Sequence, residues 1–254
     1  MRTLKYLAPF YGALMVLTVA SEMQASGGKA EWGYEGSKGP ANWGTLSPDY
    51  STCKDGRMQS PIDLAAANLN ARVKVDFDYK PVPLTVLNNG HTVQFNVKNG
   101  SKLSASGVDF ELLQVHFHTP SEHVMSGKTY PLEAHFVHAT GDGRLAVVGV
   151  FFVEGKANKA LETLFKRIPE TKTPATTYAD ITIDPNQLLP KRRGMYRYMG
   201  SLTTPPCSEA VNWHVMKRTK TASKEQLERL AKILGNNARP AQSPFSRLIV
   251  GPNR

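Results

Sequence analysis

The stretch Leu112-Leu113-Gln114-Val115-His116-Phe117-His118 decides the fold of this chain and points to its chemistry. It is a short, strongly β-prone run with two histidines separated by one residue. Side chains alternate between the two faces of a strand, so His116 and His118 are expected to project from the same face. Leu113, Val115 and Phe117 are expected on the opposite face, packed into the core. The stretch therefore predicts two imidazoles held by one rigid strand.

A third imidazole follows in the run from Pro131 to His138, which also reads as a strand. Its alternation places Glu133 and His135 on one face, together with Val137. Three neutral imidazoles without a thiolate are typical of a catalytic zinc site that keeps a fourth position open. We therefore expect His116, His118 and His135 to be metal ligands.

Two polar residues share faces with these candidate ligands. Gln114 lies on the face of His116, and Glu133 lies on the face of His135. Ligating histidines generally donate their second ring N–H to a carboxylate or carbonyl oxygen. Gln114 and Glu133 are therefore predicted to orient the ligands; the alternative for each is an ordinary surface polar residue.

The rest of the chain predicts more strands than helices. Strand patterns joined by short turns favour an antiparallel arrangement. The further predicted strands cover residues 73–78, 84–87, 91–97, 145–153, 196–202 and 211–216. Two helices are expected over residues 157–165 and 223–234, the second with a capping box formed by Ser223 and Gln226 and with Gly235 as its stop. With no internal repeat and no linker, these patterns predict a single α+β domain, mainly β, over residues 27–254.

Composition excludes few classes of function. The 254 residues carry a formal net charge of +10, with a pI of about 9.6. The basic residues are spread along the chain, and the densest group is Lys191-Arg192-Arg193. Such a net charge is compatible with an anionic partner but does not specify one. We therefore expect a solvated surface and no nucleic-acid binding.

Residues 1–26 are predicted to be a secretory signal peptide. Arg2 and Lys5 precede an apolar stretch over residues 7–20, and small residues follow, so that cleavage is expected between positions 20 and 27. The apolar stretch is too short to span a bilayer, so the mature protein is expected to lack a stable membrane span. A retained N-terminal anchor is the alternative. The expected location is periplasmic or secreted.

Export favours a disulfide bond. The two cysteines, Cys53 and Cys207, both lie in the mature part of the chain. In an oxidising compartment such a pair is most simply one disulfide, and two free buried thiols are the alternative.

Several motifs together resemble the α-class carbonic anhydrases, in particular the bacterial, secreted type. The similarity covers about residues 32–250, and its motifs occur in the family's order. They are Gln59-Ser60-Pro61-Ile62-Asp63, Asn88-Asn89-Gly90-His91, Gln114-Val115-His116-Phe117-His118, Ser121-Glu122-His123, Glu133-Ala134-His135-Phe136-Val137-His138, Ser201-Leu202-Thr203-Thr204-Pro205-Pro206 and Asn237-Ala238-Arg239-Pro240-Ala241-Gln242.

The resemblance implies a fold, a cofactor and an activity. The fold would be a large central, mostly antiparallel twisted sheet with a few short peripheral helices. The activity would be the reversible hydration of CO₂ to bicarbonate and a proton, by attack of a zinc-bound hydroxide, with Zn²⁺ held by His116, His118 and His135. CO₂ and bicarbonate would be the small-molecule partners, and a homodimer is a further expectation.

The resemblance also assigns residues to catalysis. Thr203 would accept a hydrogen bond from the hydroxide and donate its own to Glu122. His91 would carry protons to solvent, with Tyr34 ordering the intervening water. The expected substrate pocket consists of Val137, Val147, Leu202, Thr204, Val211 and Trp213. His123, His138 and His214 are left over and are interpreted as structural.

Other interpretations remain open. His116, His118 and Glu122 approximate the first metal motif of the cupins, although no second cupin motif follows. The chain could also be a non-catalytic binding protein with the same fold, or a zinc store. One departure from many animal members of the family is Thr119-Pro120, which replaces Trp-Gly after His118.

Overall fold

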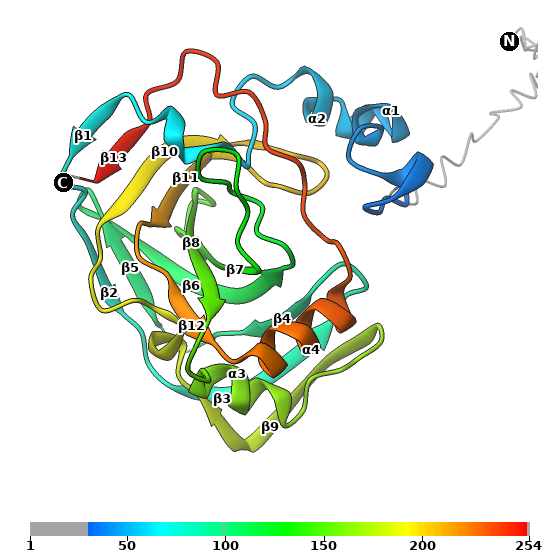
Figure 1. Ribbon diagram of the computed structural model, residues 1–254, viewed down its shortest axis with the longest axis vertical. Coiled ribbons are helices and arrows are strands. Elements are labelled where there is room, and N and C mark those ends of the chain that lie inside the picture. Colours follow the sequence, from blue (N-terminus) through cyan, green and yellow to red (C-terminus); the bar gives the residue numbers. More distant parts are fainter. Residues whose placement is uncertain (1–29, 99, 253–254) are drawn as a thin grey trace, which may run out of the picture.

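A 13-stranded sheet dominates the computed structural model, which describes residues 30–98 and 100–252 (Figure 1). The predicted signal peptide lies outside the described residues. Along its main path the strand order is β1-β13-β10-β11-β8-β7-β6-β4-β3-β9, while β12 pairs with β8 and β2 pairs with β5, which in turn pairs with β6. The strands are β1 (Leu69–Ala71), β2 (Val75–Asp78), β3 (Val82–Asn88), β4 (Val93–Asn96), β5 (Lys102–Ala105), β6 (Val108–His118), β7 (Leu132–Ala139), β8 (Leu145–Glu154), β9 (Thr173–Ile183), β10 (Met195–Ser201), β11 (Glu209–Met216), β12 (Lys220–Ala222) and β13 (Val250–Pro252).

Most neighbouring strands are antiparallel, as expected from the short turns. The exceptions among the described residues are the parallel pairs β1–β13, β11–β8 and β12–β8. Residues 30–98 and 100–252 contain four short α-helices: α1 (Trp43–Leu46), α2 (Thr52–Asp55), α3 (Lys159–Phe165) and α4 (Lys224–Leu234). The prediction of a mainly β domain with a large, mostly antiparallel sheet is confirmed.

Two apolar clusters lie against opposite faces of the central strands. On β8, Val148 and Val150 belong to the larger cluster, whereas Val147 and Phe151 belong to the smaller one. Because successive side chains of a strand point to opposite faces, the long apolar run of β8 is buried on both sides. The larger cluster supports the sheet from behind, and the smaller cluster lies on the face that carries the three candidate ligands.

The predicted orientation of Leu113 is wrong. Val115 and Phe117 are fully buried as expected, but Leu113 is 42% exposed, and Leu112 is fully buried instead. The register between β6 and β7 shifts between Leu112 and Gln114, where a β-bulge adds one residue to β6. The bulge reverses the alternation, so that Leu112 and Val115 both face the core while His116 and His118 face the other side.

Both predicted helices are present. Asn158 caps α3, and Ser223 caps α4 in a capping box completed by Gln226. Gly235 follows α4 with a positive φ of 62°, which a glycine adopts without strain. The long strand β9 was not expected, because its outward-facing residues from Thr173 to Thr177 are polar or small and show no apolar alternation. The strand β3 begins at Val82 despite Pro83, whose side chain is exposed.

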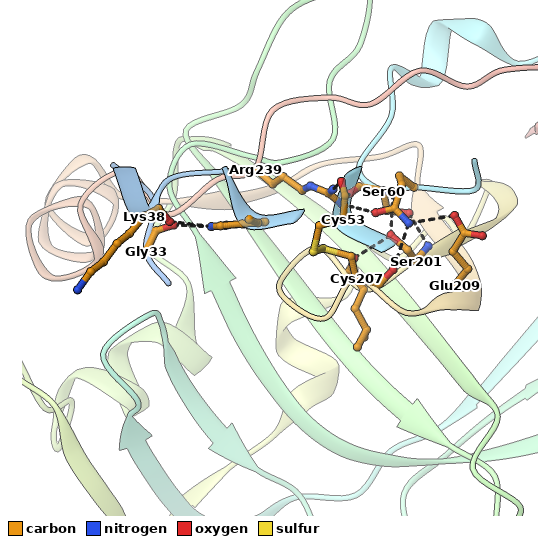
Figure 2. Close-up of a disulfide and its surroundings, with 11 residues drawn as sticks. Gly33, Lys38, Cys53, Ser60, Ser201, Cys207, Glu209 and Arg239 are labelled. Atoms are coloured by element: carbon orange, nitrogen blue, oxygen red, sulfur yellow. Dashed lines mark hydrogen bonds between the residues drawn. A yellow bond between two sulfur atoms is a disulfide. The ribbon is translucent and has the colours of Figure 1, made fainter. Parts of the chain in front are cut away.

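Between residue 30 and β1 the chain forms only short helical segments, and aromatic residues hold it. Trp43 is fully buried and donates its indole N–H to the carbonyl oxygens of Gly33 and Lys38. Cys53 at α2 forms a disulfide with Cys207, across 154 residues of sequence (Figure 2). The prediction of one disulfide is confirmed.

Arg239 lies beside this disulfide and binds the segment that contains Cys53 (Figure 2). Its guanidinium donates to the carbonyl oxygens of Cys53 and Ser60 and to Oε1 of Gln59. Gln59 in turn donates to the carbonyl oxygen of Cys207. The buried Arg239 thereby holds the N-terminal segment, and Gln59 links that segment to the loop after β10, which contains Thr203.

Candidate active site

Three histidines on two adjacent strands form a compact group. His116 and His135 are direct partners in the register of β6 and β7, and His118 lies two residues further along β6. Each offers one ring nitrogen to a set whose members lie within 4.8 Å of one another. His118 and His135 are almost fully buried, and His116 is partly buried. The structure thus brings together the three residues that the sequence singled out.

A different protein oxygen lies beside the outer nitrogen of each imidazole. Nδ1 of His116 lies 2.9 Å from Oε1 of Gln114. Nδ1 of His118 lies 2.8 Å from the carbonyl oxygen of Asn237, and Nε2 of His135 lies 3.0 Å from Oε1 of Glu133. These contacts fix the ring orientations and leave one nitrogen of each ring for a ligand.

The electrostatic environment favours neutral imidazoles at two of the three positions. Burial lowers the pKa of His116 and of His118. Burial also opposes protonation of His135, but the charge and hydrogen bond of Glu133, together with the charge of Glu122, outweigh it and raise the pKa of His135. Burial alone would raise the pKa of Glu133; the neighbouring His123 and His135 instead bring it well below its usual range. Glu133 is therefore an ionised anchor within a fully buried network.

That network extends behind the three histidines to Tyr198. The second carboxylate oxygen of Glu133 accepts the backbone N–H groups of Glu122 and His123. The ring of His123 lies 2.8 Å from Oε1 of Glu133 and 2.7 Å from the hydroxyl of Tyr198. Both nitrogens of His123 are thus engaged, which agrees with its interpretation as structural.

Glu122 is buried close to the three histidines. Its Oε1 accepts the backbone N–H of Arg239 at 2.9 Å. Its Oε2 has no hydrogen-bond partner and lies 3.5 Å from Nε2 of His118 and 3.8 Å from Nδ1 of His135. The contact with Thr203 that the family resemblance implies is not among the hydrogen bonds of residues 30–98 and 100–252.

A cavity of about 140 Å³ opens onto His116 and His118. Tyr34, His91 and Gln94 also line it, together with Thr204 from the predicted substrate pocket. The cavity therefore connects two of the candidate ligands with the candidate proton carrier. Gln94 was not singled out from the sequence.

His91 lies at this cavity in contact with Trp32, a contact that the sequence did not predict. The rings of His91 and Trp32 stack, with centroids 3.8 Å apart and planes 9° apart. Tyr34 approaches His91 with its edge, at 6.5 Å between centroids. Burial and the charge of Lys172 lower the pKa of His91, against the opposing charge of Glu31.

The apolar candidates for the substrate pocket form a group beside His135. All five belong to the smaller apolar cluster, in which Val147, Val211 and Trp213 are buried and Val137 and Leu202 are partly buried. The ring of Trp213 lies 4.9 Å from that of His135, and its indole N–H donates to the carbonyl oxygen of Ser201. These contacts place an apolar wall next to the three histidines.

The comparisons with known proteins agree with this arrangement. The family model described as "Eukaryotic-type carbonic anhydrase" matches residues 38–250. A carbonic anhydrase of Nostoc sp. (strain PCC 7120 / SAG 25.82 / UTEX 2576) is 42% identical over 224 residues, which cover 86% of this chain and 85% of that protein. A carbonic anhydrase of Pectobacterium atrosepticum is also 42% identical, with 86% and 90% covered.

A solved structure shares the fold as well. The α-carbonic anhydrase of Thermovibrio ammonificans, solved with the inhibitor sulfanilamide, superimposes with a TM-score of 0.81 at 45% identity and covers 88% of this chain and 100% of its own. These comparisons, together with the mainly β fold and the group of three histidines, identify the chain as an enzyme. The chain belongs to the α-carbonic anhydrases, enzymes that hydrate CO₂. This membership sets the cupin interpretation aside.

Proposed function

We propose that the protein catalyses the zinc-dependent, reversible hydration of CO₂ to bicarbonate and a proton. The observation that carries this proposal is the group of His116, His118 and His135, each with its outer ring nitrogen beside a protein oxygen. Such outer contacts are typical of histidines that bind a metal.

The residues present fit a zinc ion. Three imidazole nitrogens and no thiolate suit a catalytic zinc site. Nε2 of His118 is buried without a hydrogen-bond partner, which is costly for a polar atom unless a ligand takes that position. When bound, zinc supplies a water molecule that loses its proton near neutral pH, as is established for carbonic anhydrases.

The chain's own groups would orient the reactants. We assign to Oε2 of Glu122 the role of accepting the hydroxyl of Thr203, so that the Thr203 oxygen can accept a hydrogen bond from the attacking group. Two observations support this role: Oε2 has no protein donor, and Thr203 is buried with only 6% of its surface exposed. The backbone N–H of Arg239 holds the other carboxylate oxygen in place.

The apolar cluster beside His135 would hold CO₂. CO₂ carries no charge and accepts hydrogen bonds weakly, so apolar side chains suit it better than polar ones. Val137 and Leu202 are the partly buried members of this wall, and Trp213 fixes its position next to His135.

His91 would transfer protons between the cavity and solvent. Imidazole titrates near neutral pH, and His91 is partly exposed where the cavity opens. Stacking on Trp32 holds its ring, and Tyr34 lines the same cavity with its edge toward His91.

We also propose that the protein acts in the periplasm or outside the cell. The Cys53–Cys207 disulfide supports this location, because disulfides persist mainly in oxidising compartments. Among the described residues, no helix is long and apolar enough to cross a membrane.

A stopped-flow CO₂ hydration assay with a pH indicator tests the proposed reaction. The purified protein is assayed as isolated, after chelation, and after zinc is restored. We expect activity to disappear on chelation and to return with zinc. A zinc-loaded protein without CO₂ hydration activity would refute the proposal and favour a non-catalytic member of the family.

A further inference from the structure

A basic cleft lies away from the three histidines, between two parts of the sheet that do not pair with each other. The segment Ala71–Asp76, which leads from β1 into β2, lines it on one side, and Arg197 of β10 and Val250 of β13 line it on another. Figure 1 shows β2 and β5 beside β10 and β13 at one edge of the molecule. The cleft has a volume of about 480 Å³, and a second cleft of about 380 Å³ adjoins it across the same segment.

The charged side chains that line the two clefts are mostly cationic. The lining contains four cations and one carboxylate: Arg72, Lys74, Arg193, Arg197 and Asp76. Within residues 30–98 and 100–252, none of these four cations forms an ion pair with a carboxylate. Arg193 stacks over the ring of Phe77 instead. The lining therefore carries positive charge that the protein does not neutralise.

Arg197 is held in a fixed position at this cleft. Its Nε donates to Oδ1 of Asn212 on β11, at 3.0 Å. Arg197 is only partly exposed, and its two terminal amino groups make no hydrogen bond among the described residues. A positioned guanidinium with free terminal donors is suited to binding two oxygens of one anion.

His214 lies directly beside Arg197. The two residues are opposite partners in the antiparallel register of β10 and β11, so their side chains emerge from the same face. His214 is 1% exposed, and neither of its ring nitrogens has a hydrogen-bond partner. A buried imidazole without any partner is rare in folded proteins, because losing hydrogen bonds to water is costly. Burial and the nearby charge of Arg197 lower the pKa of His214 to about 3, so its ring is neutral and can donate one N–H.

We propose that this cleft binds a small oxyanion, such as bicarbonate or phosphate, on the free terminal amino groups of Arg197, in front of the buried ring of His214. Arg72 and Lys74 at the mouth of the cleft attract the anion, and Asp76 limits the total charge it can hold. The site is separate from the candidate zinc site, since Trp213, the residue before His214, projects from the opposite face of β11 toward His135. If bicarbonate is the ligand, the proposed reaction supplies it; phosphate binding would not depend on that reaction.

Titration of the zinc-loaded protein with bicarbonate, and separately with inorganic phosphate, tests this site. The signals of the His214 ring and of Nε of Arg197 are followed by ¹⁵N NMR. We expect saturable shifts in both signals with at least one of the two anions. The anion that binds more tightly is then the ligand of the cleft. Arg197→Gln should weaken this binding by at least tenfold. Arg192→Gln is the matched control, because Arg192 is exposed and lines neither cleft, and it should bind as the unchanged protein does.

Two further variants keep the test decisive. Lys74→Gln changes an exposed residue of the cleft and should weaken binding even if Arg197→Gln does not fold. His118→Ala removes a candidate zinc ligand and should leave the His214 and Arg197 shifts unchanged, so that failure of the proposed reaction and failure of this site can be told apart. Shifts that do not saturate up to 100 mM anion, or that persist unchanged in both Arg197→Gln and Lys74→Gln, would overturn the proposal.

Discussion

The backbone carbonyl oxygen of Asn237 lies 2.8 Å from Nδ1 of His118, although 119 residues separate the two in sequence. The side chain of Asn237 makes further contacts around the same site. Its Nδ2 donates to the carbonyl oxygens of His91 and Phe117, and its Oδ1 accepts the N–H of Thr119. One asparagine therefore connects a candidate zinc ligand with the candidate proton carrier.

Replacing Asn237 should weaken zinc binding although Asn237 is not itself a candidate ligand. In Asn237→Ala the carbonyl oxygen remains, but the three contacts that hold its backbone in place are lost. Partners of this kind typically contribute 10–100-fold to metal affinity, and we expect a loss of about tenfold or more. Competition with a chelator of known affinity measures it. The exposed neighbour variant Asn236→Ala should bind zinc normally, and equal affinities in the two variants would contradict the role of Asn237.

The bulge in β6 gives a prediction for two adjacent leucines. Leu112→Ala should lower the free energy of unfolding by about 2–5 kcal/mol, because its fully buried side chain leaves a cavity. Leu113→Ala should change it by no more than about 0.5 kcal/mol, because that side chain is largely exposed. Urea unfolding of both variants measures the difference. The opposite order would mean that β6 follows the uninterrupted alternation expected from its sequence.

The proton-transfer role of His91 predicts a buffer-dependent defect. His91→Ala should slow CO₂ hydration at least about tenfold in dilute buffer, where proton removal limits turnover. Concentrated imidazole buffer should restore most of the rate, because the buffer then takes over the transfer. Stopped-flow rates across a range of buffer concentrations provide the measurement. Unchanged turnover of the variant in dilute buffer would exclude His91 as the proton carrier.

His138 should make the folded protein sensitive to acid. Burial lowers its pKa to about 3, and the ring lies against the Tyr79 hydroxyl and the Ala146 carbonyl oxygen within the larger apolar cluster. Between about pH 6.5 and pH 3 the unfolded chain binds a proton at this residue that the folded chain does not. The contribution of His138 to the free energy of unfolding is therefore fully present above pH 6.5. Below pH 6.5 it falls by up to about 1.4 kcal/mol per pH unit.

His138→Gln removes this titration and keeps a hydrogen-bonding side chain beside Tyr79. Urea unfolding of the metal-free proteins from pH 7 to pH 4 compares the two slopes. The variant should lose stability less steeply toward acid pH than the unchanged protein. Identical slopes would show that His138 does not contribute.

Local patterns in the sequence predicted the parts of the site that depend on alternation along one strand. His116 and His118 share a face of β6, and Glu133 and His135 share a face of the neighbouring strand β7, because the period of a strand is two residues. The sequence pattern could not reveal the bulge at Leu113, since an inserted residue leaves no signal in a run that is apolar on both sides. The prediction that His116 and His118 share a face is unaffected, because the bulge lies before His116.

Contacts between distant segments were not predictable in the same way. Asn237 and Arg239 lie in motifs that resemble the family, but their contacts with His118 and Glu122 depend on a tertiary arrangement. The sequence did not connect Trp32 with His91, and only the fold shows that their rings stack. The disulfide was predictable because the chain contains one pair of cysteines.

Zinc titration of the metal-free protein tests the central claim most directly, with CO₂ hydration measured at each addition. We predict that activity rises in proportion to added zinc and stops rising at one zinc per chain, and that His118→Ala gains no activity over the same range. Full activity in the metal-free protein, or a His118→Ala variant that responds to zinc as the unchanged protein does, would contradict the assignment of His116, His118 and His135 as the zinc site.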